Sequence, residues 1–141
     1  MSTTNETAIR QLIADWEIAA RTHDIEGVMA YHTSDMLAFD VPPPDQIKGA
    51  DAYRKHWETC FTYFQGPGIF EVTELNVTAG EEVAFATCIT HCGGTQLNGE
   101  TCQGTARATL GFRKIDGQWM FTHEHHSMPI SMGDETSEVK S

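Results

Sequence analysis

Acid and imidazole side chains gather near the C-terminal end of the chain, in the segment His123-Glu124-His125-His126. Imidazole titrates closest to neutral pH, and a neighbouring carboxylate can orient the ring or share its proton. An inward-facing glutamate needs such a partner or an elevated pKa. Two interpretations of Glu124 are open: a proton-transfer pair with His91 or His126, or a structural ion pair.

A metal site is the other chemistry that this cluster suggests. His123 and His125 share one face of a strand, whereas a third ligand such as His91 or Glu124 falls on the opposite face in the expected register. That arrangement is poor for tetrahedral zinc. We therefore predict no metal ion and no cofactor. Four cysteines match no paired zinc motif and are expected to be free thiols: Cys60, Cys88, Cys92 and Cys102.

The composition sets the class of protein. The chain has 141 residues, of which 40% are hydrophobic and 21% charged, and its net charge is −11. These values fit a single globular domain. The negative charge disfavours nucleic acid and anionic membranes. No apolar run approaches the roughly 20 residues of a membrane span, and the start of the chain lacks a signal-peptide pattern, so a cytoplasmic protein is expected.

Helical patterns occupy the first half of the chain. Apolar residues recur at helical spacing up to Arg21, and a second, short helix is expected over 25–31. Met36–Val41 predicts a short strand that three prolines terminate. A third helix is expected to begin at Gly49 and to stop before Gly66-Pro67-Gly68.

Extended patterns fill the second half. Asn98-Gly99 between two extended segments is a strong hairpin signal, and Asp116-Gly117 marks another turn. Helices followed by a β-meander indicate an α+β fold. We expect one domain over residues 1–132 and a polar tail over 133–141. The expected strands are Ile69–Thr78, Glu82–Gln96, Glu100–Ile115 and Gln118–Ser127.

The turn lengths set the expected register. A two-residue turn at Asn98-Gly99 would pair Ile89 with Ala108, and a three-residue turn centred on Asp116 would pair Ala108 with Glu124. A slip of one residue would exchange the two faces. The face expected to meet the helices carries Phe85, Thr87, Ile89, His91, Ala106, Ala108, Leu110, Phe112, Met120, Thr122, Glu124 and His126.

The small side chains of Ala106 and Ala108 would leave a pocket on that face, lined by His91, Glu124 and His126. The opposite face would expose an aromatic patch that needs cover, so we expect a homodimer through this outer face. Its expected residues include Cys88, Thr90, Cys92, Trp119, Phe121, His123 and His125.

Several segments carry a resemblance to a known superfamily. They are His23–Met29, Met36–Asp40, Gly49–Tyr53, and Asp116–Trp119 followed by His123–Pro129. In type and order they resemble the SnoaL-like and ketosteroid-isomerase-like members of the nuclear transport factor 2-like superfamily, over about residues 5–130. The resemblance implies a cone-shaped, cystatin-like fold. Three N-terminal helices would pack on a curved, mostly antiparallel sheet that encloses a pocket.

The resemblance also assigns a role to Asp40, which matches the general base of ketosteroid isomerases. Trp16 and Leu110 stand where those enzymes have a tyrosine and a second acid, and leucine cannot donate a hydrogen bond. Steroid isomerisation by that mechanism is therefore not expected. We expect proton transfer on a small, hydrophobic, carbonyl-containing molecule, as isomerisation, cyclisation or dehydration. Asp40 would be the base, and His91, Glu124 and His126 would position or protonate the substrate.

The alternative is a non-catalytic module for ligand binding or assembly, like the association domain of calmodulin-dependent kinases. That domain's pocket uses arginines where this chain has Ile89, Leu110 and His126. An enzyme predicts a polar network around an open cavity, whereas a scaffold predicts a filled core. The expected ligand contacts are Trp16, His56, Trp57, Thr87, Ile89, Ala106, Ala108, Leu110 and Thr122.

Overall fold

Three helices and two short strands form the N-terminal part of the computed structural model, which describes residues 4–130. Helix α1 buries the apolar stripe that includes Ile9, Leu12 and Trp16, as its periodicity predicts. Gly49 caps the N-terminus of α3 at φ +93°, a conformation that favours glycine. The elements are α1 (Thr4–Arg21), α2 (Ile25–Met29), β1 (His32–Phe39), β2 (Ile47–Lys48) and α3 (Ala50–Phe61).

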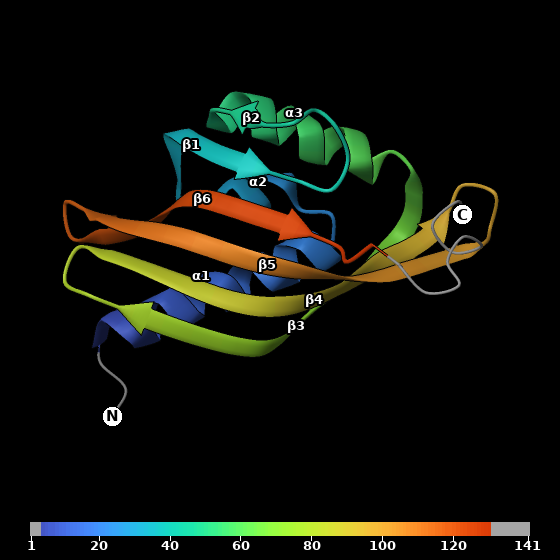
Figure 1. Ribbon diagram of the computed structural model, residues 1–141. Helices are drawn as coiled ribbons and strands as arrows, with labels where there is room; N and C mark the ends of the chain where they lie inside the picture. The colour runs from blue at the N-terminus through green and yellow to red at the C-terminus, as the bar shows by residue number, and fades with distance from the viewer. Residues whose placement is uncertain (1–3, 131–141) are drawn as a thin grey trace.

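Four long strands complete a six-stranded sheet in the order β2-β1-β6-β5-β4-β3. Figure 1 shows α1 and α2 behind this curved sheet, with no helix in front of it. Every pairing is antiparallel except that of β1 with β6. The expected break at Gly66-Pro67-Gly68 lies inside β3, where the pairing with β4 is irregular. The long strands are β3 (Phe64–Ala79), β4 (Val83–Gln96), β5 (Thr101–Ile115) and β6 (Gln118–Ser127).

The β4–β5 hairpin corrects the expected register by one residue. Gln96 N–H donates to the Glu100 carbonyl over 2.8 Å, so the loop has three residues, 97–99, rather than two. Cys88 therefore pairs with Ala108, and Thr90 with Ala106. Because a slip of one residue exchanges the faces, the residues of β4 expected inside lie on the outer face: Phe85, Thr87, Ile89 and His91.

A bulge in β6 corrects the expected position of two aromatic rings. The turn Asp116-Gly117 has two residues at positive φ, 49° and 81°. Phe112 pairs with Phe121 but Gly111 pairs with His123, so Thr122 is an extra residue. Trp119 and Phe121 are thus buried, at 2% and 1% exposure, instead of lying on the outer face. The same bulge returns Glu124 to the inner face.

Two groups of buried residues form the core. The larger lies between α1 and the sheet and includes Trp16, Phe112 and Phe121. The smaller joins α3 to β1 and β2 through Tyr53, Met36, Ala38 and Ile47. This second group fixes the face of α3 that points at the sheet.

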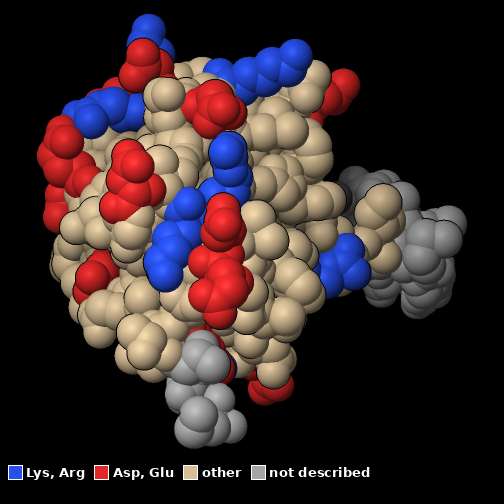
Figure 2. All heavy atoms as spheres, turned by 90° about the vertical axis from the view of Figure 1, so that its left-hand side faces the viewer, with Lys and Arg blue, Asp and Glu red and all other residues tan. Residues whose placement is uncertain are grey.

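Charges of both signs are interspersed on the surface that Figure 2 shows, where acidic side chains outnumber but do not exclude Lys and Arg. No helix within residues 4–130 has the length and apolar character needed to cross a membrane. The predicted tail, residues 133–141, lies outside the described residues.

Gly93 lies where the backbones of β4 and β5 are close together. It has φ +153°, and an added Cβ would lie 1.9 Å from the Cys102 carbonyl oxygen. We expect Gly93→Ala to lower the free energy of unfolding by more than about 2 kcal/mol in urea titrations. Gly104→Ala is the control, because its Cβ would meet only Met128 Cε at 3.4 Å. Equal stability of the two variants would contradict this packing.

Candidate acid–base site

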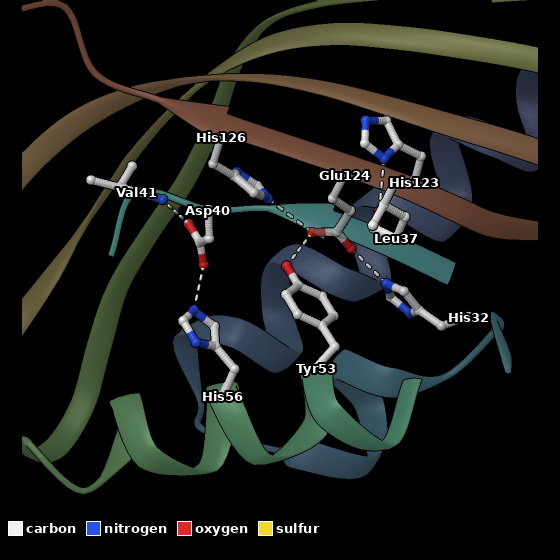
Figure 3. A network of polar contacts seen from close by, with 9 residues as sticks. All are labelled: His32, Leu37, Asp40, Val41, Tyr53, His56, His123, Glu124 and His126. Atoms are coloured by element: carbon white, nitrogen blue, oxygen red, sulfur yellow. Dashed lines mark hydrogen bonds and ion pairs between the residues drawn. The ribbon is translucent and has the colours of Figure 1, made fainter. Parts of the chain in front are cut away.

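The carboxylate of Glu124 is fully buried and accepts three hydrogen bonds (Figure 3). Tyr53 Oη donates to Oε1 over 2.5 Å, and His126 Nε2 donates to the same oxygen over 2.8 Å. His32 Nε2 donates to Oε2 over 2.5 Å. The donors come from α3, β6 and β1, so this one carboxylate connects three elements.

Local structure fixes each donor. Tyr53 is fully buried on the face of α3 that packs against β1 and β2. The ring of His32 stacks on Phe121 with centroids 4.5 Å apart and planes 8° from parallel. His126 lies two residues beyond Glu124 on the same strand face and stacks on Trp16 at 6.1 Å. The network is therefore held by packing as well as by hydrogen bonds.

Opposing effects act on the pKa values of this network. Burial alone would raise the pKa of Glu124, but hydrogen bonds from His126 and His32, with the charges of those rings, lower it overall. Burial would lower the pKa of His126, but the hydrogen bond and charge of Glu124, with the charge of Asp40, raise it overall. Glu124 is therefore ionised, and the imidazolium form of His126 is favoured.

Tyr53 is held in its neutral form. Burial, followed by the negative charges of Glu124 and Asp40, raises the pKa of this phenol well above its ordinary value. It therefore acts as a hydrogen-bond donor and not as a base.

A second carboxylate–imidazole pair joins Asp40 and His56. Asp40 follows the last residue of β1, and its Oδ1 accepts the Val41 N–H over 2.7 Å. His56 Nε2, from α3, lies 2.7 Å from Oδ2. The side chains are 19% and 13% exposed. Figure 3 shows Asp40 between His56 and His126, so the two pairs converge on one place.

Both pairs reach a largely apolar cavity of about 510 Å³ between the helices and the sheet. Asp40 and His126 line it directly. The lining also contains Ala20, His23, Val41, Pro42, Trp57, Cys60, Phe61, Phe64, Ile69, Phe70, Thr90, Cys92, Gly93, Cys102, Gln103, Gly104, Ala106 and Met128.

One ring nitrogen of His126 is available to a ligand. Nε2 is committed to Glu124, whereas Nδ1 has no hydrogen-bond partner within residues 4–130. The side chain is 9% exposed and lines the cavity. A protonated His126 can therefore donate a hydrogen bond from Nδ1 to a bound molecule.

The structure sorts the residues predicted from the sequence into three groups. Asp40, Trp57, Ala106 and His126 line the cavity, and behind them Glu124 and His56 hold His126 and Asp40. Trp16, Ala108 and Leu110 are buried in the core rather than exposed to the cavity.

The remaining predicted residues do not reach the cavity. Because the β4–β5 loop is one residue longer than expected, Thr87, Ile89 and His91 lie on the outer face. There the His91 ring contacts Gln103 Oε1 at 2.7 Å instead of Glu124. Thr122 is the extra residue of the β6 bulge and is absent from the cavity lining.

Two members of the network were missed by the sequence analysis. Tyr53 falls within the predicted third helix, but helical spacing says nothing about the partner of its hydroxyl. His32 precedes the predicted strand Met36–Val41, whereas β1 begins at His32. A predicted strand that began at His32 would have placed this imidazole at the start of the strand.

Metal-ligating side chains do not cluster in the described part of the chain, where no three His, Cys, Asp or Glu residues lie close enough to hold an ion. The four cysteines are free, as expected. The chemistry that the site itself offers is proton transfer between carboxylate, imidazole and a bound molecule.

Comparison with known proteins defines the class of this fold. A protein from Nostoc punctiforme described as having a cystatin-like fold aligns with a TM-score of 0.74 at 17% identity, over 93% of this chain and 96% of that one. A family model of the SnoaL-like domain matches residues 9–131. The chain therefore belongs to the SnoaL-like family, within the NTF2-like superfamily.

A more similar structure is an NTF2-like protein of unknown function from Pseudomonas putida, with 41% identity and a TM-score of 0.85 over 96% of this chain and 94% of that one. An NTF2-like protein from Streptomyces avermitilis, provisionally assigned as a dehydratase, has a TM-score of 0.82 at 13% identity, over 93% and 100% of the two chains. No curated protein matches the sequence.

The raised pKa of His126 makes stability depend on pH. A group whose pKa is higher in the folded state contributes fully below its ordinary value, here 6.5, and loses that contribution as pH rises through the folded value. We expect the wild-type free energy of unfolding to fall as the pH rises above 6.5 in urea titrations.

Glu124→Gln should flatten this slope, because it removes the charge that raises the pKa, and should cost about 3 kcal/mol at the acidic end. The exposed Glu100→Gln is the control and should keep the wild-type slope. A Glu124→Gln protein with the wild-type slope would show that Glu124 does not set the protonation of His126.

Proposed function

We propose that this protein binds a small, uncharged, largely apolar carbonyl compound in the cone cavity and moves a proton on it without a cofactor. Asp40 is the general base, and His126 supplies a hydrogen bond or a proton to the substrate oxygen. The reaction class is isomerisation, cyclisation or dehydration.

The observation that carries this proposal is the convergence of two carboxylate–imidazole pairs on one cavity. In the first pair the carboxylate of Asp40 faces the cavity and His56 lies behind it. In the second pair the order is reversed, since the imidazole of His126 faces the cavity and Glu124 lies behind it. A base and an acid thus stand beside each other, each with a partner that fixes its orientation.

The proton movement follows from these positions. Asp40 takes a proton from the carbon next to the carbonyl, and the electron pair moves onto the carbonyl oxygen. The His126 Nδ1–H donates to that oxygen and stabilises its negative charge. Asp40 then returns the proton to another carbon in an isomerisation, or a hydroxyl departs with a proton from His126 in a dehydration.

The cavity favours an uncharged ligand. No lysine or arginine is among the residues that line it, and the charge of the His126 imidazolium is already paired with Glu124, so a phosphate or carboxylate would find no unpaired counter-charge. Aromatic side chains, including Trp57, Phe61 and Phe70, supply flat apolar walls. The volume of about 510 Å³ lies within the usual range for small-molecule sites.

Asp40→Asn tests the assignment of the base, because the amide cannot take a proton from carbon. A panel of neutral aryl ketones is incubated in D₂O, and NMR follows deuterium uptake at the carbon next to the carbonyl. We expect the wild-type protein to accelerate exchange for at least one ketone and Asp40→Asn to lose about 100-fold or more of that rate at an unchanged melting temperature.

Asp35→Asn is the matched control, since Asp35 is an exposed residue of β1 outside the cavity lining. It should exchange at the wild-type rate. If Asp40→Asn exchanges as fast as the wild type, Asp40 is not the base.

A second copy of the chain is the partner that we propose for the outer face of the sheet. Val83 and Phe85 of β4 are 64% and 49% exposed there, and no described helix covers this face (Figure 1). Exposed apolar side chains on an uncovered sheet face favour association.

Sedimentation at micromolar concentration tests this dimer. We expect twice the monomer mass for the wild type and the monomer mass for Phe85→Glu, which places a charge in the contact. Leu97→Glu changes an apolar residue of the β4–β5 loop that is even more exposed, at 67%, and should leave the dimer intact. A monomeric wild type would rule the dimer out.

A further inference from the structure

A second hollow of about 760 Å³ lies beside the cone cavity. The loop after β1 and the end of β6 form it. Its lining includes Phe39, Asp45, His125 and Ser127, and three consecutive prolines, 42–44, form part of its wall. Prolines restrict the backbone, so this wall is largely organised before a ligand binds.

The two hollows meet at the proposed reacting groups. Asp40 and His126 line both of them, as do Val41, Pro42 and Met128. A molecule that contacts Asp40 from the cone cavity is therefore within reach of the second hollow. A ligand can fill the first space with one part and enter the second with another.

The second hollow differs from the cone cavity in its polar groups. Its lining includes the acids Asp40 and Asp45 and also Ser127, whose hydroxyl accepts a hydrogen bond from Arg107 Nε over 3.3 Å. The cone cavity is walled chiefly by aromatic and aliphatic side chains. Neither lining contains lysine or arginine. Carboxylates only accept hydrogen bonds when ionised, so Asp40 and Asp45 favour a ligand group that donates hydrogen bonds over an anion.

His126 adds an independent sign that a ligand belongs at the junction. Its side chain is only 9% exposed, and its Nδ1 has no hydrogen-bond partner in the described chain. This nitrogen is therefore available to a bound molecule. A ligand oxygen at the boundary between the hollows would satisfy it.

We infer that the ligand has two parts: an apolar aromatic body in the cone cavity, and a head group in the second hollow that donates hydrogen bonds and has no negative charge. The head group is a hydroxyl or an ammonium. This inference rests on the proposed function for the place of the carbonyl, which lies between the two parts, beside Asp40 and His126.

Four matched probes test the inference by isothermal titration calorimetry. The parent is 2-acetylnaphthalene, and three derivatives carry a hydroxyethoxy, an aminoethoxy or a carboxymethoxy arm on the distal ring edge. We expect the hydroxyl and ammonium arms to tighten binding about tenfold over the parent, as one good hydrogen bond can. The carboxylate arm should bind no better than the parent.

Asp45→Asn separates the two head groups. If the charge of Asp45 is responsible for recognition, this variant loses the gain in affinity from the ammonium arm and keeps that from the hydroxyl arm. If a hydrogen bond to Asp45 is responsible, the gains in affinity from both arms fall. Parent binding should be unchanged in either case. Asp35→Asn, outside both linings, should change none of the four affinities.

The inference is overturned if the parent binds and no arm improves on it, or if the carboxylate arm binds best. Failure of all four probes to bind also overturns it. None of these outcomes decides whether Asp40 is a base, which the deuterium-exchange experiment measures separately.

Discussion

A buried carboxylate imposes the strongest constraint on this molecule. Glu124 has no contact with solvent, and an ionised carboxylate in that position is tolerated only when donors surround it. Tyr53, His32 and His126 supply the donors, each from a different element. The positions of α3 against β1 and of β1 against β6 are thus tied to one side chain. A change in any of these contacts would leave a buried charge with too few partners.

The shape of the cavity follows from which side chains occupy each end of the cone. At one end Trp16, Phe112 and Phe121 fill the space between α1 and the sheet. Toward the other end small residues such as Ala106 leave it open. The β6 bulge makes both arrangements possible on one strand, because it turns Phe121 and Glu124 to the same side. The first end is consequently core, and the second end holds the polar pairs.

Much of this arrangement can be predicted from the sequence. Helical spacing identified α1 and α3, and extended segments located β4, β5 and β6 to within a residue or two. Similarity to the superfamily singled out Asp40 within the predicted strand Met36–Val41, and the structure places it one residue beyond the end of β1. The alternation of side chains along the strands placed Glu124 and His126 on the inner face. The structure reaches the same result in another way, with a shorter turn than expected and a bulge that was not foreseen.

The face of β4 could not be predicted in the same way. One additional loop residue, which Gln96 and Glu100 enclose, decides whether His91 or Thr90 points inward. His32 and Tyr53 were missed for another reason, since their roles depend on contacts between segments far apart in the sequence. Local patterns report periodicity, and they do not report which buried hydroxyl or imidazole will meet which carboxylate.

The proposed chemistry depends on a protonated His126 close to the carboxylate of Asp40. Glu124 favours the imidazolium form of His126, so that this ring holds a proton that it can donate. Asp40 lines the cavity, with His56 behind it. The most direct test of this division is an NMR titration of the His126 imidazole in the wild-type protein. We predict a midpoint above the ordinary value of 6.5. A midpoint below that value would mean that burial outweighs Glu124 and would contradict the role of His126 as the acid.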